Sequence, residues 1–175
     1  PRWPFEKFNL ADRTLGTQMK ATGEVMAIDR SLEGSLLKAI RSLEIGLDHI
    51  ELKKIAHESM EQLIERLHLV DDERIYVVAE ALRKGISVEK IHYITKIDTF
   101  FIEKIKNIVT VEKALAEQGL TEDVLRKAKR YSFTDSVIAR YANTTVEDVR
   151  AKRKEWNEYL RQVSNWELER YLGVL

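Results

Sequence analysis

The sequence predicts a mainly α-helical fold, an irregular helical domain preceded by two short β-strands. Both prolines among the 175 residues, Pro1 and Pro4, lie at the very start, so none interrupts residues 5–175. Proline is the residue that most strongly stops a helix. Beyond the first thirty residues, apolar side chains recur at the spacing of one helical face, and glycines follow several of these runs. The chain is therefore expected to form one helix after another.

The first thirty residues show a different pattern, which we interpret as two strands. Residues 3–8 and 24–28 are short segments with partial alternation of apolar and polar side chains, and neither continues at the helical period. Two strands alone are marginally stable in water. We therefore expect them to form the edge of a sheet whose remaining strands are missing here.

The first half of the helical region is expected to contain four helices. Each is marked by a polar side chain that can accept hydrogen bonds from the first turn, by apolar residues at helical spacing, or by both. In order, they run from Ser31 to Gly46, over residues 53–68, from the caps Asp71 and Asp72 over residues 75–84, and from Ser87 through Ile94. Gly85 follows the third helix, where a left-handed residue is needed.

The second half is expected to contain four more helices. In order, they open at Asp98, Thr121, Thr134 and Thr144, and the last two extend to near Tyr141 and over residues 149–159. The first of these is the longest and reaches Gly119, with Phe101 and Ile105 beginning its apolar stripe. It is apolar nearly all round at its start, which is typical of a central helix. Thr144 and Glu147 have the spacing of a capping box.

Composition excludes several classes of protein. The chain has no cysteine, which excludes a disulfide scaffold, a thiolate zinc site, an iron–sulfur cluster and a cysteine nucleophile. Its 29 Lys and Arg balance 29 Asp and Glu, which argues against a surface built to hold nucleic acid or an anionic membrane. No stretch approaches the roughly 18 apolar residues of a membrane span. A chain without cysteine suits a reducing compartment, so a cytoplasmic location is expected.

No catalytic, cofactor-binding or metal-ligating residue is predicted. The sequence lacks the glycine-rich phosphate loops and the Gly-x-Ser-x-Gly turn of serine hydrolases. His57, Glu61 and Glu65 are expected to share a helix face and have the spacing to ligate a metal ion. Glu61, however, stands where the His-Glu-x-x-His motif needs its second histidine, and a solvated charged face is the favoured interpretation.

One segment supports an alternative function, nucleic-acid binding by a helix-turn-helix over residues 134–155. Its second helix carries a group of basic side chains, namely Arg150, Lys152, Arg153 and Lys154. Recognition helices read bases with their first turns, and here that turn holds Glu147 and Asp148, which would face phosphates. Residues 121–161 contain ten basic and seven acidic side chains, a surplus of three that would release few counterions.

Several motifs resemble the large chain of carbamoyl-phosphate synthase. The most specific is Thr-Gln-Met-Lys-Ala-Thr-Gly-Glu-Val-Met-Ala-Ile at residues 17–28, preceded by Pro-Arg-Trp-Pro-Phe-Glu-Lys-Phe at residues 1–8. The helical part agrees over residues 73–87, 95–102 and 125–135, so that the resemblance covers roughly residues 1–155. Three departures are Asp29 in place of a family glycine, Phe100 in place of a tryptophan, and no recognisable linker after Trp156.

The resemblance implies a place within a longer chain, as does a start at Pro1 rather than methionine. Residues 1–30 would be the C-terminal end of the ATP-grasp carboxyphosphate domain, so that the two strands are a remnant of its sheet. Residues 31–160 would be the helical oligomerisation domain, and residues 161–175 a divergent linker or tail. The segment itself would be non-catalytic and hold no cofactor.

The resemblance also implies what the parent enzyme would do. In the family, two ATP-grasp units use ATP and magnesium to make carbamoyl phosphate from bicarbonate and ammonia, which a glutaminase small subunit supplies. The expected partners of this segment are other large subunits, the flanking ATP-grasp halves of its own chain and, in the parent complex, that small subunit. Neither nucleic acid nor a membrane is expected as a partner, and arginine and pyrimidine biosynthesis both stay open as pathways.

The candidate self-association surface is an apolar stripe formed by Leu36, Ile40, Leu43 and Leu47. Further apolar residues lie partly around the side of the same helix, so it presents apolar side chains over a wide arc. A helix of this kind can face two partners, the core and a second surface. The alternative is that all of these leucines pack internally, as helical leucines usually do.

Overall fold

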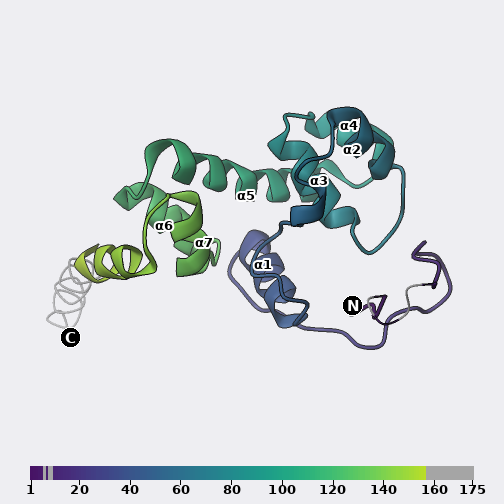
Figure 1. Cartoon of the computed structure of the whole chain (residues 1–175), viewed down its shortest axis with the longest axis horizontal. Coiled ribbons are helices and arrows are strands. Elements are labelled where there is room, and N and C mark those ends of the chain that lie inside the picture. Colours follow the sequence, from purple (N-terminus) through teal and green to yellow (C-terminus); the bar gives the residue numbers. More distant parts are fainter. Residues whose placement is uncertain (6, 8–9, 157–175) are drawn as a thin grey trace, which may run out of the picture.

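The chain is mainly helical, as the sequence predicts. The computed structural model describes residues 1–5, 7 and 10–156 (Figure 1). Within those ranges, seven α-helices and one 3-10 helix follow one another. They are α1 (Leu32–Ser42), η1 (Lys53–Ile55), α2 (Met60–Leu67), α3 (Arg74–Arg83), α4 (Val88–Thr95), α5 (Thr99–Gln118), α6 (Glu122–Arg130) and α7 (Asp135–Tyr141). Residues 146–156 are also helical.

Helix α5 is the central helix of the fold, around which most of the other helices pack. In Figure 1 it runs between the group of α2, α3 and α4 on one side and the pair α6 and α7 on the other. It packs against α1, α3, α4, α6 and α7, as expected of a central helix. The side chains that it buries recur every three or four residues, and they are Ile102, Ile105, Ile108, Val111, Glu112 and Leu115.

The first turn of α5 differs from the prediction. Phe101 was expected in the buried stripe, yet its side chain is 49% exposed and that of Phe100 is 53% exposed. Ile102 is fully buried instead. Successive helical residues point about 100° apart, so a buried face that passes through Ile102 and Ile105 turns Phe101 to its edge.

The two predicted strands are not formed in the described part of residues 1–30, and that prediction is wrong there. One isolated antiparallel bridge joins Arg2 and Gly23, in which the Arg2 N–H donates to the Gly23 carbonyl at 2.7 Å. Met26 and Ile28 are largely exposed. Two segments with no further strands beside them have no sheet to extend, which leaves the single bridge.

The N-terminal arm, by which we mean the described residues up to 28, is held against the helices by ion pairs. The Arg13 guanidinium donates to both carboxylate oxygens of Asp72 at 2.9 and 2.7 Å and to Glu73 at 2.5 Å. The Leu15 N–H donates to the carbonyl of Val70 at 2.6 Å. Both contacts lie at the connection between α2 and α3, so the arm is attached to the helices there through residues 13–15.

Helix α1 begins where predicted and ends earlier. The Ser31 side chain accepts a hydrogen bond from the Gly34 N–H at 3.0 Å, as an N-cap should. The helix was expected to reach Gly46, but it ends at Ser42. Glu44 adopts the left-handed conformation, with φ of 54°, and this reverses the chain before Gly46, which is also left-handed at 75°.

Two further boundaries were wrong because capping boxes were assigned incorrectly. The helix expected over residues 53–68 is divided into η1 and α2, because Ser59 caps α2 in a reciprocal pair of hydrogen bonds with Gln62. The box expected at Thr144 lies one residue later. There the Thr145 hydroxyl accepts from the Asp148 N–H at 3.1 Å, and the Thr145 N–H donates to the Asp148 carboxylate at 3.3 Å.

Candidate functional site

The four predicted interface residues lie along one groove. Leu36, Ile40, Leu43 and Leu47 all line a hollow of about 880 Å³, although Leu47 lies beyond the end of α1. The other apolar walls come from the N-terminal arm, from α3 and from the start of α5, and include Trp3, Phe5, Val25, Ile75, Tyr76, Val78, Phe101 and Ile105. The charged residues at Arg13, Lys54 and 71–74 also line it. We call this hollow the α1 groove.

Burial differs around the circumference of α1. Leu37 is fully buried and Ile40 is 3% exposed, and both belong to the hydrophobic core. Leu36, Leu43 and Leu47 are only partly buried. The helix therefore contacts the core along one side and presents partly accessible leucines to the α1 groove along the next, which is the geometry of a helix with room for a second apolar neighbour.

Exposed aromatic side chains extend the apolar surface next to the groove. The rings of Phe100 and Phe101 meet edge to face with centroids 5.4 Å apart, and the ammonium of Lys104 lies 5.3 Å from the centroid of Phe100. Phe101 belongs both to this pair and to the groove wall. Burial of Phe101 was expected, because apolar residues on every side of a helix usually mark a central, buried helix.

A buried polar cluster, which no sequence pattern indicated, lies beside α5. His49 and Glu112 are 1% and 3% exposed, and the Nε2 atom of His49 lies 2.7 Å from Oε1 of Glu112. The Arg83 guanidinium donates to Oε2 of the same carboxylate at 2.7 Å and to the Ile50 carbonyl at 2.7 Å. These contacts join the loop after α1 to α3 and α5.

The charge of Glu112 is maintained by its neighbours. Burial alone would raise the pKa of this carboxyl, but the hydrogen bonds and charge of Arg83, with the hydrogen bond of His49, outweigh it and lower the pKa to about 2. The His49 ring also packs against Phe133, with centroids 4.7 Å apart. The cluster is enclosed, and its contacts hold together the loop after α1, α3 and α5.

Asp29, at a position where the resemblance implies a glycine, forms a second polar cluster. Its carboxylate accepts from the Ser132 hydroxyl at 2.7 Å and pairs with the Lys38 ammonium at 2.7 Å. It also accepts from the backbone N–H groups of residues 30 and 31. The bonds from Lys38 and Ser132 lower the pKa of Asp29 well below its usual range. Asp29 thereby connects the start of α1 to the turn between α6 and α7.

Comparison with known proteins decides the family. The sequence profile described as "Carbamoyl-phosphate synthetase large chain, oligomerisation domain" matches residues 24–157. The chain belongs to this family. The match begins seven residues before the first residue of the expected helical domain and includes the α1 groove leucines, both polar clusters and all the described helices.

Curated relatives carry the name of the same large chain. "Carbamoyl phosphate synthase large chain" of Lachnoclostridium phytofermentans is 50% identical over 155 residues, which is 89% of this chain and 14% of that protein. The proteins of the same name from Thermoanaerobacter sp. and Caldanaerobacter subterraneus subsp. tengcongensis are 48% and 47% identical over 159 residues, in each case 91% of this chain and 15% of the relative. The chain thus spans about one seventh of their length.

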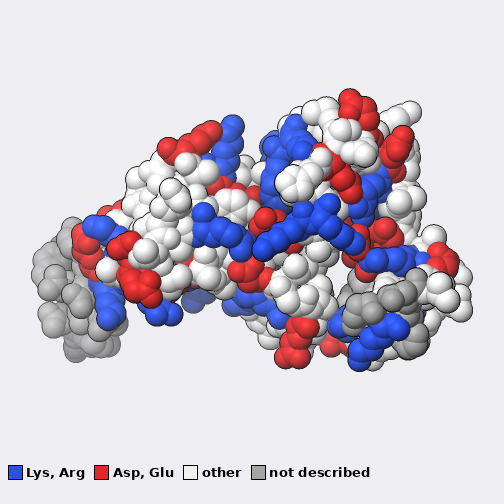
Figure 2. Space-filling view, in the orientation of Figure 1, with Lys and Arg blue, Asp and Glu red and all other residues white. Residues whose placement is uncertain are grey.

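The helix-turn-helix alternative gains no support for this member of the large-chain family. Arg153 pairs with Asp135 at 2.5 Å and Lys152 with Glu155 at 2.8 Å, so two of the four basic side chains are already bound to acids. Exposed Glu147 lies in the first turn of the second helix. Figure 2 shows acidic and basic side chains mixed over this face of the molecule, apart from one short basic band near its centre.

The shared helix face considered for His57, Glu61 and Glu65 is not formed in the part of the chain that the structure describes. His57 lies in the turn before α2, so it does not share a helix face with Glu61 and Glu65 as predicted. The Glu61 carboxylate instead accepts a hydrogen bond from the Ser59 hydroxyl at 2.8 Å. No group of three potential ligands comes together in the described ranges, and none of the helices there is long and apolar enough to cross a membrane.

Proposed function

We propose that this chain is a non-catalytic helical oligomerisation and linker segment of a carbamoyl-phosphate synthase large subunit. It would bring large subunits together through the leucine stripe of Leu36, Ile40, Leu43 and Leu47 and connect the flanking ATP-grasp halves of its own chain. The family assignment supports the assembly role. The choice of surface is supported by one observation, that all four side chains line the same partly open apolar groove.

The parent enzyme would carry out the chemistry outside this segment. By its resemblance, it would make carbamoyl phosphate from bicarbonate, glutamine-derived ammonia and two ATP, with magnesium in its ATP-grasp units and ammonia delivered by a glutaminase small subunit. Within the chain, we propose that residues 1–30 belong to the first ATP-grasp unit and residues 31–160 to the oligomerisation domain. The proposed tail, residues 161–175, lies outside the described residues.

The test is a charged substitution in the groove. Leu43→Glu would place a carboxylate in a contact that must lose its water, which carries a large desolvation cost. We expect the dimer dissociation constant, measured by analytical ultracentrifugation, to rise by about tenfold or more, since each 1.4 kcal/mol corresponds to a factor of ten. Helix content by circular dichroism should stay unchanged.

Leu69→Glu is the matched control, because Leu69 is 54% exposed and does not line the groove. This variant should associate like the unchanged chain. Equal association of both variants would contradict the choice of surface. Loss of helix content in Leu43→Glu alone would show that Leu43 belongs to the core and that the interface lies elsewhere.

A further inference from the structure

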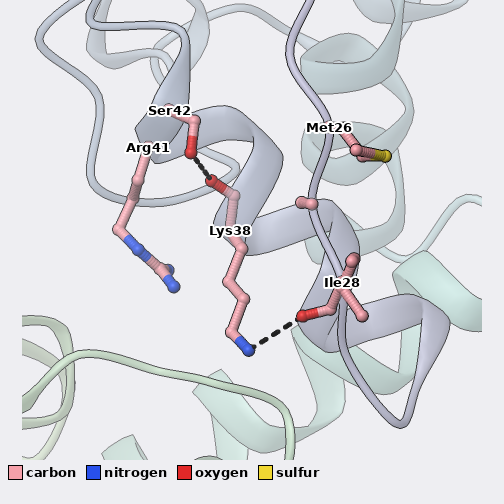
Figure 3. Close-up of a pocket in the computed structure, with 6 residues that line it drawn as sticks. Met26, Ile28, Lys38, Arg41 and Ser42 are labelled. Atoms are coloured by element: carbon pink, nitrogen blue, oxygen red, sulfur yellow. Dashed lines mark hydrogen bonds between the residues drawn. The ribbon is translucent and has the colours of Figure 1, made fainter.

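A second, separate hollow lies beside α1. This cleft of about 370 Å³ is lined by Met26, Ala27 and Ile28 of the arm and by Lys38, Arg41 and Ser42 of α1. None of these residues lines the α1 groove. Figure 3 shows the Lys38 and Arg41 side chains extending in the same general direction from α1, with the Lys38 ammonium bonded to the Ile28 carbonyl at 3.1 Å.

Arg41 is the unusual residue of this cleft. Its guanidinium makes no hydrogen bond or ion pair within the described residues, and its Nη1 atom is shielded from solvent without a partner. Burial lowers the pKa of this guanidinium, because the charged form loses hydration. The charges of Asp48 and Asp29 act on Arg41 in the opposite sense, but neither carboxylate bonds to its guanidinium, so a negatively charged group in direct contact with it would be stabilising.

The acids near Arg41 are bound elsewhere. Asp29 pairs with Lys38, and Asp48 lies 3.4 Å from the guanidinium of Arg140. Lys129, whose pKa is lowered by burial and in smaller part by the charge of Arg41, is paired with Asp135 at 3.1 Å. The charge of Arg41 is thus left without a paired carboxylate at the edge of an open cleft.

We propose that this cleft binds a small oxyanion, either a phosphate or a carboxylate, through the guanidinium of Arg41. The planar guanidinium presents parallel N–H donors that match the two oxygens of such a group. The cleft volume is at the lower end of the range for small-molecule sites, which favours a ligand of few atoms. The site is independent of the proposed self-association.

The test measures thermal unfolding of the whole 175-residue chain in sodium phosphate, sodium acetate and sodium chloride at equal ionic strength. A ligand that binds the folded state raises the midpoint in a saturable way. We expect phosphate or acetate to raise it beyond the effect of chloride, and the effective anion identifies which oxyanion the site takes. Arg41→Gln should weaken the apparent affinity about tenfold or more, relative to its own baseline in chloride.

Arg126→Gln is the matched control, because Arg126 is paired with Glu122 within α6 and does not line the cleft. It should keep the anion-dependent rise. The proposal is overturned if neither anion exceeds chloride, or if Arg41→Gln responds like the unchanged chain. If Arg41→Gln fails to fold, the arginine side-chain NMR signals of the unchanged chain provide the test. The proposal predicts that the Arg41 Nε–H signal shifts on addition of the anion. A signal that does not shift overturns the proposal.

Discussion

Asp29 shows how one residue connects separate parts of the fold. Its carboxylate lies directly over the first turn of α1, where a Cβ added to Gly34 would come within 2.5 Å of the Asp29 Cγ atom. The carboxylate has little freedom to move aside, because Lys38 and Ser132 both hold it. Gly34 is therefore required by its neighbour in space, while its own backbone conformation is ordinary for a helix.

This contact predicts opposite effects of one substitution in two backgrounds. Gly34→Ala should destabilise the unchanged chain by roughly 1–3 kcal/mol, because the new methyl group overpacks against Asp29. In an Asp29→Gly background the clash is removed, and the same change should stabilise the chain by up to about 1 kcal/mol through helix propensity. Urea unfolding of the four variants measures the coupling. Equal effects in both backgrounds would contradict the account.

The Glu112 cluster predicts how stability depends on pH. The pKa of Glu112 is about 2 in the fold against an ordinary value of 4.5, so its contribution to stability is present at neutral pH and is lost as the pH falls from about 4.5 to about 2. At about 1.4 kcal/mol per pKa unit, the full contribution is roughly 3 kcal/mol. Glu112→Gln should reduce the free energy of unfolding at pH 7 and flatten its decline in this acid range.

The control for this prediction is Glu103→Gln, since Glu103 is an exposed acid on the same helix, paired only with Lys106 at 3.3 Å. Chemical denaturation at a series of pH values should show a normal acid decline for this variant. A decline in Glu112→Gln as steep as in the unchanged chain would mean that other carboxylates carry the acid sensitivity.

At the scale of the elements, local sequence signals predicted most of the helices. Features that depend on contacts between residues far apart in the sequence were not predicted. Ser87 and Asp98 cap α4 and α5 as expected, because these interactions span only a few residues. Gly85 and Gly119 follow α3 and α5 with positive φ, as the sequence also indicated. The Ser59 capping box was readable in the same way and was overlooked. The groove was predicted only in part, since helical spacing places Leu36, Ile40, Leu43 and Leu47 on one side but gives no information about the opposing walls.

The polar clusters could not have been predicted from local pattern. His49 and Glu112 are 63 residues apart in the sequence, and Asp29 and Ser132 are 103 apart. Neither pair has a spacing that distinguishes it from ordinary surface charge. Only the packing of α1 and its following loop beside α3, α5 and the turn after α6 brings them together.

The attachment of the N-terminal arm gives a prediction about an element. Arg13→Gln should release the arm from the connection between α2 and α3, because the ion pairs with Asp72 and Glu73 are lost. Limited proteolysis should then cut within residues 10–28 several times faster, while the helical core unfolds at the same denaturant concentration. Arg126→Gln, which removes an ion pair within α6, should leave the cleavage rate unchanged. Unchanged cleavage in Arg13→Gln would place the attachment elsewhere.

At the scale of the whole molecule, the described helices form a connected core around α5 with one side of α1 left partly uncovered. The chain belongs to a family of oligomerisation domains, and the α1 groove is the surface proposed for self-association. The enclosed Glu112 cluster and the Asp29 contacts fix the segments on either side of α1. The groove walls formed by α1, α3 and α5 are thus held in place, which lowers the entropy lost when a partner binds.

The most direct test of the central claim, self-association through the α1 groove, is the mass of the chain in solution. Light scattering after size exclusion would be measured over a series of concentrations, for the unchanged chain and for Leu43→Glu. The account predicts a mass that rises with concentration towards a dimer or larger assembly, and a Leu43→Glu variant that stays monomeric over the same range. A strict monomer at the highest concentration of the unchanged chain would contradict it.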